Sequence, residues 1–395
     1  MTKTATRPQL NAAAAATFVI FGINGLVFAS WAARIPAVTD ILDISSGQMG
    51  SLLLCVAAGS LIALPTAGHV VGRIGTANAV RAAGLVAAVA GAGVALALLS
   101  ESIPGTAIAL FFFGMGIGLW DVSQNIEGAD VEHQLGRTIM PQFHAAFSGG
   151  AFLGALIGAG LAGLGVGLPA HLLVITAIVA LVTLAAPRYF LPHIPVSVPA
   201  AGESREPKGR SAWRDGRTLL IGVVVLGATL TEGAGNDWIA KAAVDGLDAA
   251  ESTGALLFAA FVLAMTAVRF FGGRAIDSYG RVPVLRASMA AAAAGLALFV
   301  LAGDIWTAIA GAVLWGAGAA LAFPMGMSAA ADDPQHAAAR VSVVSTIGYV
   351  AFLAGPPLLG YLGDLIGIRL ALLAIMIPIL GALLLAGAAK PLRAS

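Results

Sequence analysis

Long apolar runs alternate with short polar turns along almost the whole chain. Because a helix needs about 20 apolar residues to cross a bilayer, the pattern predicts twelve membrane spans. Their expected positions are residues 11–34, 47–68, 79–99, 105–126, 141–163, 168–186, 217–240, 251–272, 283–302, 305–328, 340–362 and 368–388. A polar, proline-containing segment at 187–216 follows the sixth span and is typical of a flexible linker. The sequence therefore predicts an all-α membrane protein with two pseudo-symmetric six-helix bundles, at residues 1–186 and 217–395.

A short basic turn between two apolar runs occurs once in each half. With an offset of 205 residues, Gly68, Gly75 and Arg81 of the first copy align with Gly273, Gly280 and Arg286 of the second. A second echo, at an offset of 207, aligns Trp31 with Trp238. Matches at a nearly constant offset indicate one unit written twice.

Composition supports the membrane assignment. The chain of 395 residues is 59% hydrophobic and only 10% charged, whereas about 25% of the residues of a soluble domain are charged. The single cysteine, Cys55, excludes an internal disulfide and a cysteine metal cluster, and we expect no metal or cofactor. The first apolar run is too long for a signal-peptide core and is interpreted as the first span.

The positions of the basic residues predict the orientation, because Lys and Arg are enriched in cytoplasmic loops. If the N-terminus is cytoplasmic, that side holds 18 of the 21 basic residues, Arg269 among them. Arg34, Lys241 and Arg369 fall outside it. The even number of spans then places both termini in the cytoplasm, and we expect a bacterial inner membrane.

The fourth predicted span carries a polar stripe. Gly114, Gly118, Asp121, Asn125 and Gly128 follow one another at steps of 4, 3, 4 and 3 and so share one helical face. An ionisable residue near the middle of a membrane costs about 2.5–3.5 kcal/mol on insertion scales, so it is seldom kept without a partner or a task. Asp121 and Asn125 are therefore predicted to bind solute, and Asp121 to carry a proton. The alternative is a solvated or packed carboxylate near the cytoplasmic end.

The seventh predicted span carries the counterpart of this stripe. Thr229, Glu232 and Asn236 step by 3 and 4, with Asp237 adjacent. We predict that Thr229, Glu232 and Asn236 contact solute. Glu232 is the deeper of the two acids, and we predict that it also carries a proton. Asp237 is close enough to the outer surface to be an ordinary charge at a helix end.

Other spans hold weaker candidates for solute binding. Asn24, Phe28 and Trp31 share one face of the first span and fit a solute wall, although Trp31 also fits an interfacial aromatic belt. In the fifth span, His144 fits either a proton relay or a histidine bonded to a neighbouring helix. The last candidates, in the tenth and eleventh spans, are Trp315 and Tyr349.

Enzyme motifs are absent from the sequence. There is no Gly-x-Ser-x-Gly elbow, no phosphate loop with Gly-Lys-Ser/Thr and no histidine pair at metal-binding spacing. We therefore predict that the protein is not an enzyme, and the missing phosphate loop argues against ATP-driven transport within this chain.

The duplicated turn resembles the signature loop of the major facilitator superfamily, Gly-x-x-x-Asp-Arg-x-Gly-Arg-Arg/Lys. The second copy keeps Gly273, Asp277, Gly280 and Arg281. The first keeps Gly68, Arg73 and Gly75 but has Gly72 at the acidic position. The resemblance implies that these residues form gates and that Asp277 accepts hydrogen bonds from the start of the fifth span. The corresponding contact of the first copy would be weak.

The same resemblance implies how the fold works. Spans one, four, seven and ten would line a central site, spans two, five, eight and eleven would gate it, and the two halves would rock. The chain resembles a bacterial subgroup related to fucose permeases and rhizopine-transport proteins. The resemblance lies in Asp121 with Asn125, in Phe143 with His144, and in the segment that starts at Glu232. That subgroup implies a sugar-like or cyclitol-like solute.

Together these features predict a proton-coupled secondary transporter that moves a small polar solute by alternating access. Its expected partners are the solute, protons and the lipid bilayer, with no nucleic acid, and we expect a monomer. One alternative is a drug or metabolite exporter working by proton antiport, although the glycines at 149–158 lack the proline of the drug-antiporter motif. Another is a membrane sensor that transports nothing.

Overall fold

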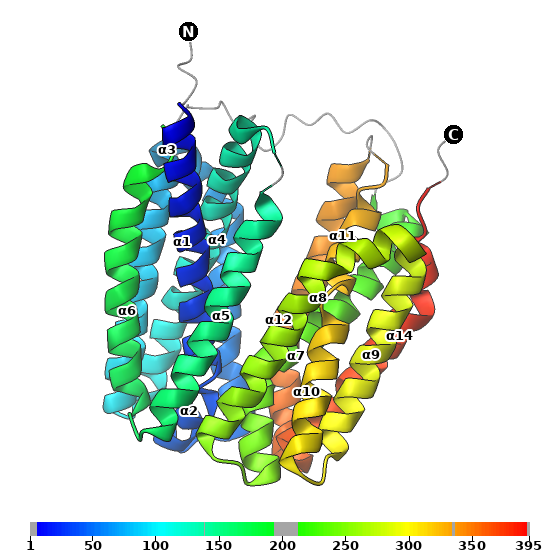
Figure 1. Cartoon of the computed structure of the whole chain (residues 1–395). Helices are drawn as coiled ribbons and strands as arrows, with labels where there is room; N and C mark the ends of the chain where they lie inside the picture. Colours follow the sequence, from blue (N-terminus) through cyan, green and yellow to red (C-terminus); the bar gives the residue numbers. More distant parts are fainter. Residues whose placement is uncertain (1–5, 138, 193–211, 334–335, 393–395) are drawn as a thin grey trace. The chain divides into compact units, whose positions relative to one another are not determined.

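The computed structural model describes residues 6–137, 139–192, 212–333 and 336–392. Within them the chain is helical and contains no strand (Figure 1), which confirms the predicted all-α class. The chain divides into two compact units. The first comprises Met1–Ile44 and Leu52–Ser204, and the second comprises Ser45–Ser51 and Arg205–Ser395. Most of the predicted linker, residues 193–211, lies outside the described residues.

The first unit is a helical bundle. Its elements are α1 (Arg7–Ala32), α2 (Ile35–Leu42), α3 (Ser46–Leu99), α4 (Ile103–Leu135), α5 (Met140–Gly163), α6 (Leu168–Ala185) and the 3₁₀ turn η1 (Ala186–Tyr189). The helices α1 and α5 lie in close contact because glycines replace side chains where their backbones meet. A Cβ atom on Gly25 would collide with the Phe147 carbonyl, and one on Gly150 with the Gly22 carbonyl. Trp120 of α4 is fully buried in the apolar core beside them.

The second unit is built around α7. Its elements are η2 (Ala212–Arg214), α7 (Gly216–Leu247), α8 (Glu251–Tyr279), α9 (Arg281–Leu301), α10 (Ile305–Ala319), α11 (Ala322–Ala330), α12 (Ala337–Ile366), α13 (Ile368–Ala371), η3 (Leu372–Ile375), α14 (Met376–Leu385) and η4 (Ala386–Ala389). The central helix α7 packs against α8, α12 and α14, which explains why it carries so many buried residues.

The two copies of the basic turn break their helices with the same backbone geometry. Gly75 has φ 81° and ψ 160° inside α3, and Gly280 has φ 83° and ψ 162° between α8 and α9. Only glycine adopts such angles without strain. At 54 residues, α3 would be about 80 Å long if straight, against an apolar bilayer core of about 30 Å. The break at Gly75 therefore divides α3 into two crossings. The eleven candidate spans among the described residues thus agree with the predicted twelve.

The tenth predicted span, 305–328, is not one continuous helix. It consists of α10 and α11, which are separated at Ala320 and Leu321. Proline lacks a backbone N–H, so Pro324 cannot donate to the carbonyl of Ala320, its partner in an unbroken helix. The break thus follows directly from the sequence and leaves one main-chain carbonyl for another donor.

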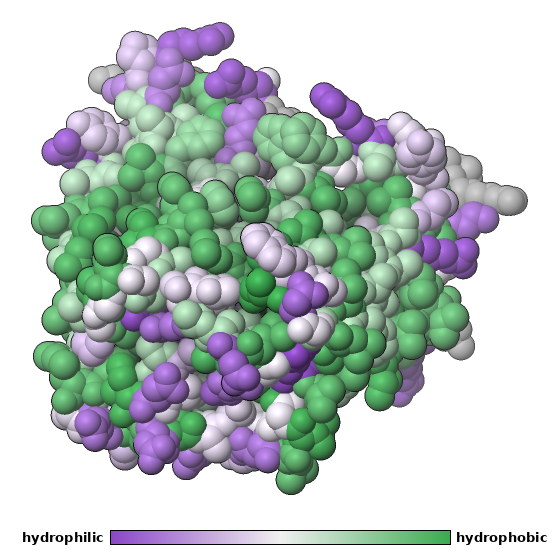
Figure 2. All heavy atoms as spheres, turned by 60° about the horizontal axis from the view of Figure 1, so that its bottom comes forward, coloured by the Kyte–Doolittle hydropathy of each residue, from purple (hydrophilic) through white to green (hydrophobic). Residues whose placement is uncertain are grey.

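Large apolar side chains are exposed along the helices, as a lipid-facing surface requires. Examples are Val89 on α3, Leu181 on α6 and Leu384 on α14, which are 71%, 69% and 78% exposed. The space-filling view shows hydrophobic side chains over much of the visible face, with hydrophilic ones gathered in patches (Figure 2).

Candidate functional site

The polar stripe of α4 divides into a packing part and a chemical part. A Cβ atom on Gly114 would collide with the Val56 carbonyl of α3, and Ser60 of α3 donates to the Gly114 carbonyl at 2.8 Å. The glycines therefore bring α4 against α3. Further along, Asp121 is exposed on the surface of the unit and accepts hydrogen bonds from Gln124 Nε2 at 3.2 Å and Asn125 Nδ2 at 3.3 Å.

His144 of α5 belongs to the same cluster. Its imidazole, when protonated, acts electrostatically on Asp121, and its ring lies edge-on to Phe21 at 5.3 Å. The side chain is exposed. The first unit therefore brings together Asp121, Asn125 and His144 from two helices, with Gln124 added. Such a cluster can hydrogen-bond hydroxyl groups and can hold a proton.

The predicted solute wall on α1 is only partly accessible in the first unit. Asn24 is 1% exposed, and neither polar atom of its amide has a hydrogen-bond partner among the described residues. A buried polar group left unpaired costs about 1–3 kcal/mol. Phe28 is half-buried beside Phe147. Trp31 is 4% exposed and lines an apolar pocket with Phe113 and other core residues, so its environment is that of a core residue.

In the second unit the predicted acid Glu232 is bound by an arginine. Arg269 of α8 donates from Nη2 to Glu232 Oε2 at 2.6 Å, and the two side chains are 33% and 21% exposed. The sequence predicts Arg269 on the cytoplasmic side, at the end of the eighth span. In the structure it lies inside α8, ten residues before the helix ends. An arginine between apolar residues of a predicted span was the signal that would have identified it.

The position of Arg269 is fixed by a second contact. Its Nε donates at 3.0 Å to the Ala320 carbonyl, which is the group that Pro324 leaves without a helical donor. The arginine therefore bridges α7, α8 and the break between α10 and α11. The planar guanidinium group suits this role because it offers several donors in fixed directions.

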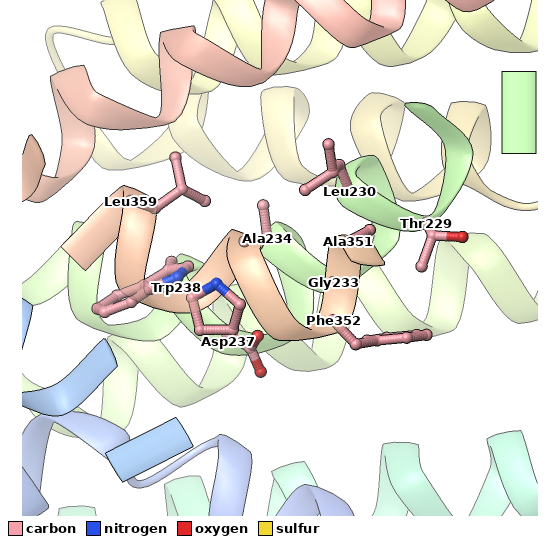
Figure 3. A pocket seen from close by; sticks show the side chains of 11 residues that line it. Thr229, Leu230, Gly233, Ala234, Asp237, Trp238, Ala351, Phe352 and Leu359 are labelled. Atoms are coloured by element: carbon pink, nitrogen blue, oxygen red, sulfur yellow. The ribbon is translucent and has the colours of Figure 1, made fainter. Parts of the chain in front are cut away.

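A groove lies between α7 and α12 of the second unit (Figure 3). Its lining includes the predicted residue Thr229, as well as Asp237 and Trp238 from α7 and Phe352 and Pro356 from α12. Thr229 is 2% exposed and donates to the Val225 carbonyl of its own helix at 2.9 Å. Trp238 is fully buried, and its indole N–H has no partner among the described residues. Asp237 is thus the ionisable group of this groove.

The remaining predicted solute contacts of this unit are dispersed. Trp315 is fully buried, donates from Nε1 to the Thr231 carbonyl at 3.2 Å and packs edge-on against Phe261. It is therefore held within the unit. Asn236 is half-buried on α7, and Tyr349 is 39% exposed on α12.

The turn residues differ in exposure. In the first copy, Gly68 is half-buried, Arg73 is exposed and Gly75 is buried. Gly273, Asp277 and Gly280 are all exposed. Arg281 donates to both carboxylate oxygens of Asp332 at 3.0–3.1 Å. The gating role of these residues stays a prediction.

The structure adds two acids that are absent from the predicted site. In the first unit Glu127 accepts from Thr76 Oγ1 at 2.5 Å and from the Leu191 backbone at 2.8 Å. In the second unit Asp332 binds Arg281 and also Arg217, at 2.8 Å. Both acids lie far from the glycine turn in sequence, and the one sequence signal that links them is the repeat offset of 205, which aligns Glu127 with Asp332.

Comparison with known proteins places this architecture in a family. The model of the Major Facilitator Superfamily matches residues 234–395. An uncharacterized transporter of Sinorhizobium fredii, y4wD, is 31% identical over 91% of this chain and 96% of its own. Membrane protein MosC of Rhizobium meliloti is 28% identical, over 90% of this chain and 85% of its own.

Solved structures agree on the fold. The crystal structure of the nucleoside transporter NupG superposes with a TM-score of 0.72 over 95% of this chain and 98% of that chain, at 16% sequence identity. Together with the repeated glycine turn and the twelve crossings found among the described residues, these similarities show that the chain belongs to the major facilitator superfamily.

Proposed function

We propose that this protein is a proton-coupled secondary transporter that moves a small polar solute, sugar-like or cyclitol-like, by alternating access. The observation that carries the proposal is the cluster of Asp121, Gln124, Asn125 and His144 on α4 and α5. Amides and a carboxylate in an apolar bundle provide the donors and acceptors that hydroxyl groups need. A hydrophobic drug would offer these groups no donor or acceptor.

The names of similar proteins support a polar solute. NupG, which shares the fold, is a nucleoside transporter, and a nucleoside carries a sugar with several hydroxyl groups. The distribution of Lys and Arg supports cytoplasmic termini, and we place the protein in a bacterial inner membrane.

The available energy is sufficient for accumulation. One proton that crosses about 150 mV supplies roughly 3.5 kcal/mol. At 1.4 kcal/mol per tenfold change, this supports a gradient of about 300-fold. Coupling requires a carboxylate that is protonated in one state and ionised in the other, and the sequence predicts Asp121 and Glu232 for this role.

A thermal-shift screen of the purified full-length protein tests the solute class. Sugars, polyols, nucleosides, carboxylates and drugs are added in turn. A solute present at 100 times its Kd should add about 2.7 kcal/mol of stability. We expect stabilisation by a polyhydroxylated compound, and Asn125→Ala should abolish it. Stabilisation by apolar drugs alone would contradict the proposal.

A further inference from the structure

The second unit holds two acids on the same helix, and their surroundings differ. Glu232 and Asp237 are five residues apart on α7, which separates them by about 140° around the helix axis. They therefore face different neighbours. If the transport proposed above is coupled to protons, the neighbours decide which of the two acids can exchange one.

Glu232 has a fixed counter-ion. Arg269 Nη2 lies 2.6 Å from its carboxylate, while Arg269 Nε is held at 3.0 Å by the Ala320 carbonyl. Because Pro324 cannot donate to that carbonyl, the arginine meets no competing helical donor. A guanidinium group held in this way stabilises the ionised carboxylate. The structure therefore holds the Glu232 carboxylate against a positioned guanidinium group.

Asp237 has no such partner. In the described part of the chain its carboxylate makes no hydrogen bond or ion pair, and the other residues that line its groove are not ionisable (Figure 3). Most of them are apolar, such as Leu230, Phe352 and Leu359. A lone carboxylate in such surroundings is more easily neutralised by a proton than one beside an arginine.

The ionisable groups around the groove do not change this picture. On α7, Lys241 lies one turn beyond Asp237, but its Nζ is 2.8 Å from Asp245. On α8, Arg269 is bound by Glu232, and Glu251 is an acid at the start of the helix. On α12, the ionisable groups nearest in sequence to the lining residues are the phenols of Tyr349 and Tyr361. Within the described residues, Lys241 and Arg269 are thus paired with other acids, and neither forms an ion pair with Asp237.

The groove also supplies an acceptor for a neutral acid. Pro356 in α12 lacks an N–H, so the Phe352 carbonyl has no helical donor. Both residues line the groove with Asp237. A protonated carboxyl group donates one hydrogen bond, and a carbonyl that lacks its usual helical donor is a suitable acceptor.

The geometry points to Asp237, and not Glu232, as the carboxylate of the second unit that takes up and releases the coupling proton. The step is a simple proton transfer, in which hydronium gives a proton to one oxygen of the Asp237 carboxylate and becomes water, and the carboxyl group later releases the proton to another water molecule. The Glu232–Arg269 pair holds α7, α8 and the α10–α11 break together. This assignment rests on the proposed proton-coupled function and changes which residue performs it.

Infrared spectroscopy of the full-length protein in liposomes tests the assignment without a known solute. Spectra are recorded between mildly acid and neutral pH for the wild type, Asp237→Asn, Glu232→Gln and Asp121→Asn. Asp304→Asn, an exposed acid before α10, is the matched control. The carboxylic-acid C=O band that changes with pH should lose one component in Asp237→Asn, and Glu232→Gln and the control should retain that component.

Thermal unfolding of the same variants in detergent provides a structural readout. Asp237→Asn should unfold at the same temperature as the wild type or higher, because it removes an unpaired carboxylate from an apolar groove. Glu232→Gln should unfold at a lower temperature, because Arg269 loses its partner. An equal drop in both variants would contradict the claim that Asp237 is unpaired.

The outcomes separate this assignment from the proposed function. If the component survives in Asp237→Asn and disappears in Glu232→Gln, the assignment is wrong, yet proton coupling remains supported. If none of the variants, Asp121→Asn included, alters the pH-dependent band, proton coupling itself fails and the assignment fails with it.

Discussion

The two copies of the glycine turn share a backbone and differ in the side chains that hold it. Gly75 and Gly280 have nearly the same φ and ψ. In the first unit Thr76 donates to Glu127 at 2.5 Å. In the second unit the residue 205 positions later, Arg281, donates to Asp332, which lies 205 positions after Glu127. A neutral donor thus stands where the other copy has a cation.

The difference shows which part of the repeat the fold constrains. The turn needs a glycine because other residues are strained at its φ. The residue after the glycine, Thr76 or Arg281, needs only to donate to an acid, so the two copies can use different donors. In the second unit Arg217 adds a second cation to Asp332, and both arginines donate to carbonyls at the end of η4, Ala389 and Lys390. We expect the second copy to depend more strongly on charge.

Removing the shared acid of the second copy should have the largest effect. Asp332→Ala leaves Arg217 and Arg281 without their carboxylate, and these three side chains are only 13–22% exposed. Loss of one partner from a largely buried ion-pair network costs about 3 kcal/mol. Thermal or denaturant unfolding in detergent measures it. The exposed acid variant Asp40→Ala serves as control and should change stability by less than about 0.5 kcal/mol.

The glycines themselves should be equally sensitive in both copies. Gly75→Ala and Gly280→Ala force a residue with a Cβ atom into a positive φ, which costs about 1–2 kcal/mol. Gly273→Ala is the control, since it is exposed within α8 and a Cβ atom there has no neighbour within 4 Å. Its stability should be equal or higher. A large difference between the two turn variants would show that the copies are not equivalent.

The neutral contact of the first copy should contribute less. Thr76→Val keeps the volume of the buried side chain but removes the donor to Glu127, which retains the Leu191 N–H at 2.8 Å. The expected loss is about 1 kcal/mol. Thr66→Val, whose hydroxyl bonds only to carbonyls of its own helix, is the matched control. A loss as large as that of Asp332→Ala would remove the distinction drawn between the copies.

We expect the smallest effect at the starts of α1 and α7, which are the first helices of the two halves. At the start of α7, burial opposes ionisation of Asp215, but hydrogen bonds led by Thr218 and the charge of Arg340 outweigh it and lower the pKa of Asp215 below its ordinary value. Its contribution is therefore present above the unfolded-state pKa and is lost as the pH falls through the folded-state pKa. The start of α1 uses the neutral pair Thr6 and Gln9 instead.

Hydrogen exchange at these two helix starts, followed towards acid pH, measures this difference. Protection should fall in the first turn of α7 and should not change in that of α1. In Asp215→Asn the pH dependence at α7 should disappear. The same acid-induced loss at both helix starts would contradict the role given to Asp215.

Much of the fold follows from the sequence, because bilayer thickness and helix periodicity are strong constraints. The twelve crossings and the repeated turn were predicted from apolar runs and from the spacing of Gly75 and Gly280. The break after α10 was missed, although Pro324 is its physical cause. Glycine at positive φ and proline without a donor are both local signals, so they can be read from one segment of chain.

The site was less predictable because it depends on contacts between helices. Asp121 and Asn125 share a helix, and their contact follows from a spacing of four residues. The partner of Glu232 is Arg269, on another helix and 37 residues away, which periodicity cannot reveal. The distinction between Glu232 and Asp237 likewise depends on α8 and α12. Sequence placed both acids on α7 but could not say which one has a counter-ion.

Solute uptake by liposomes with an imposed pH gradient tests the central claim most directly. The solute that gives the largest stabilisation in the thermal-shift screen is supplied in labelled form to the reconstituted full-length protein. The account predicts accumulation above the external concentration when the gradient is present, equilibration only when it is collapsed, and loss of accumulation in Asp121→Asn. Accumulation that is independent of the pH gradient would contradict proton coupling, as would an Asp121→Asn variant with full uphill transport.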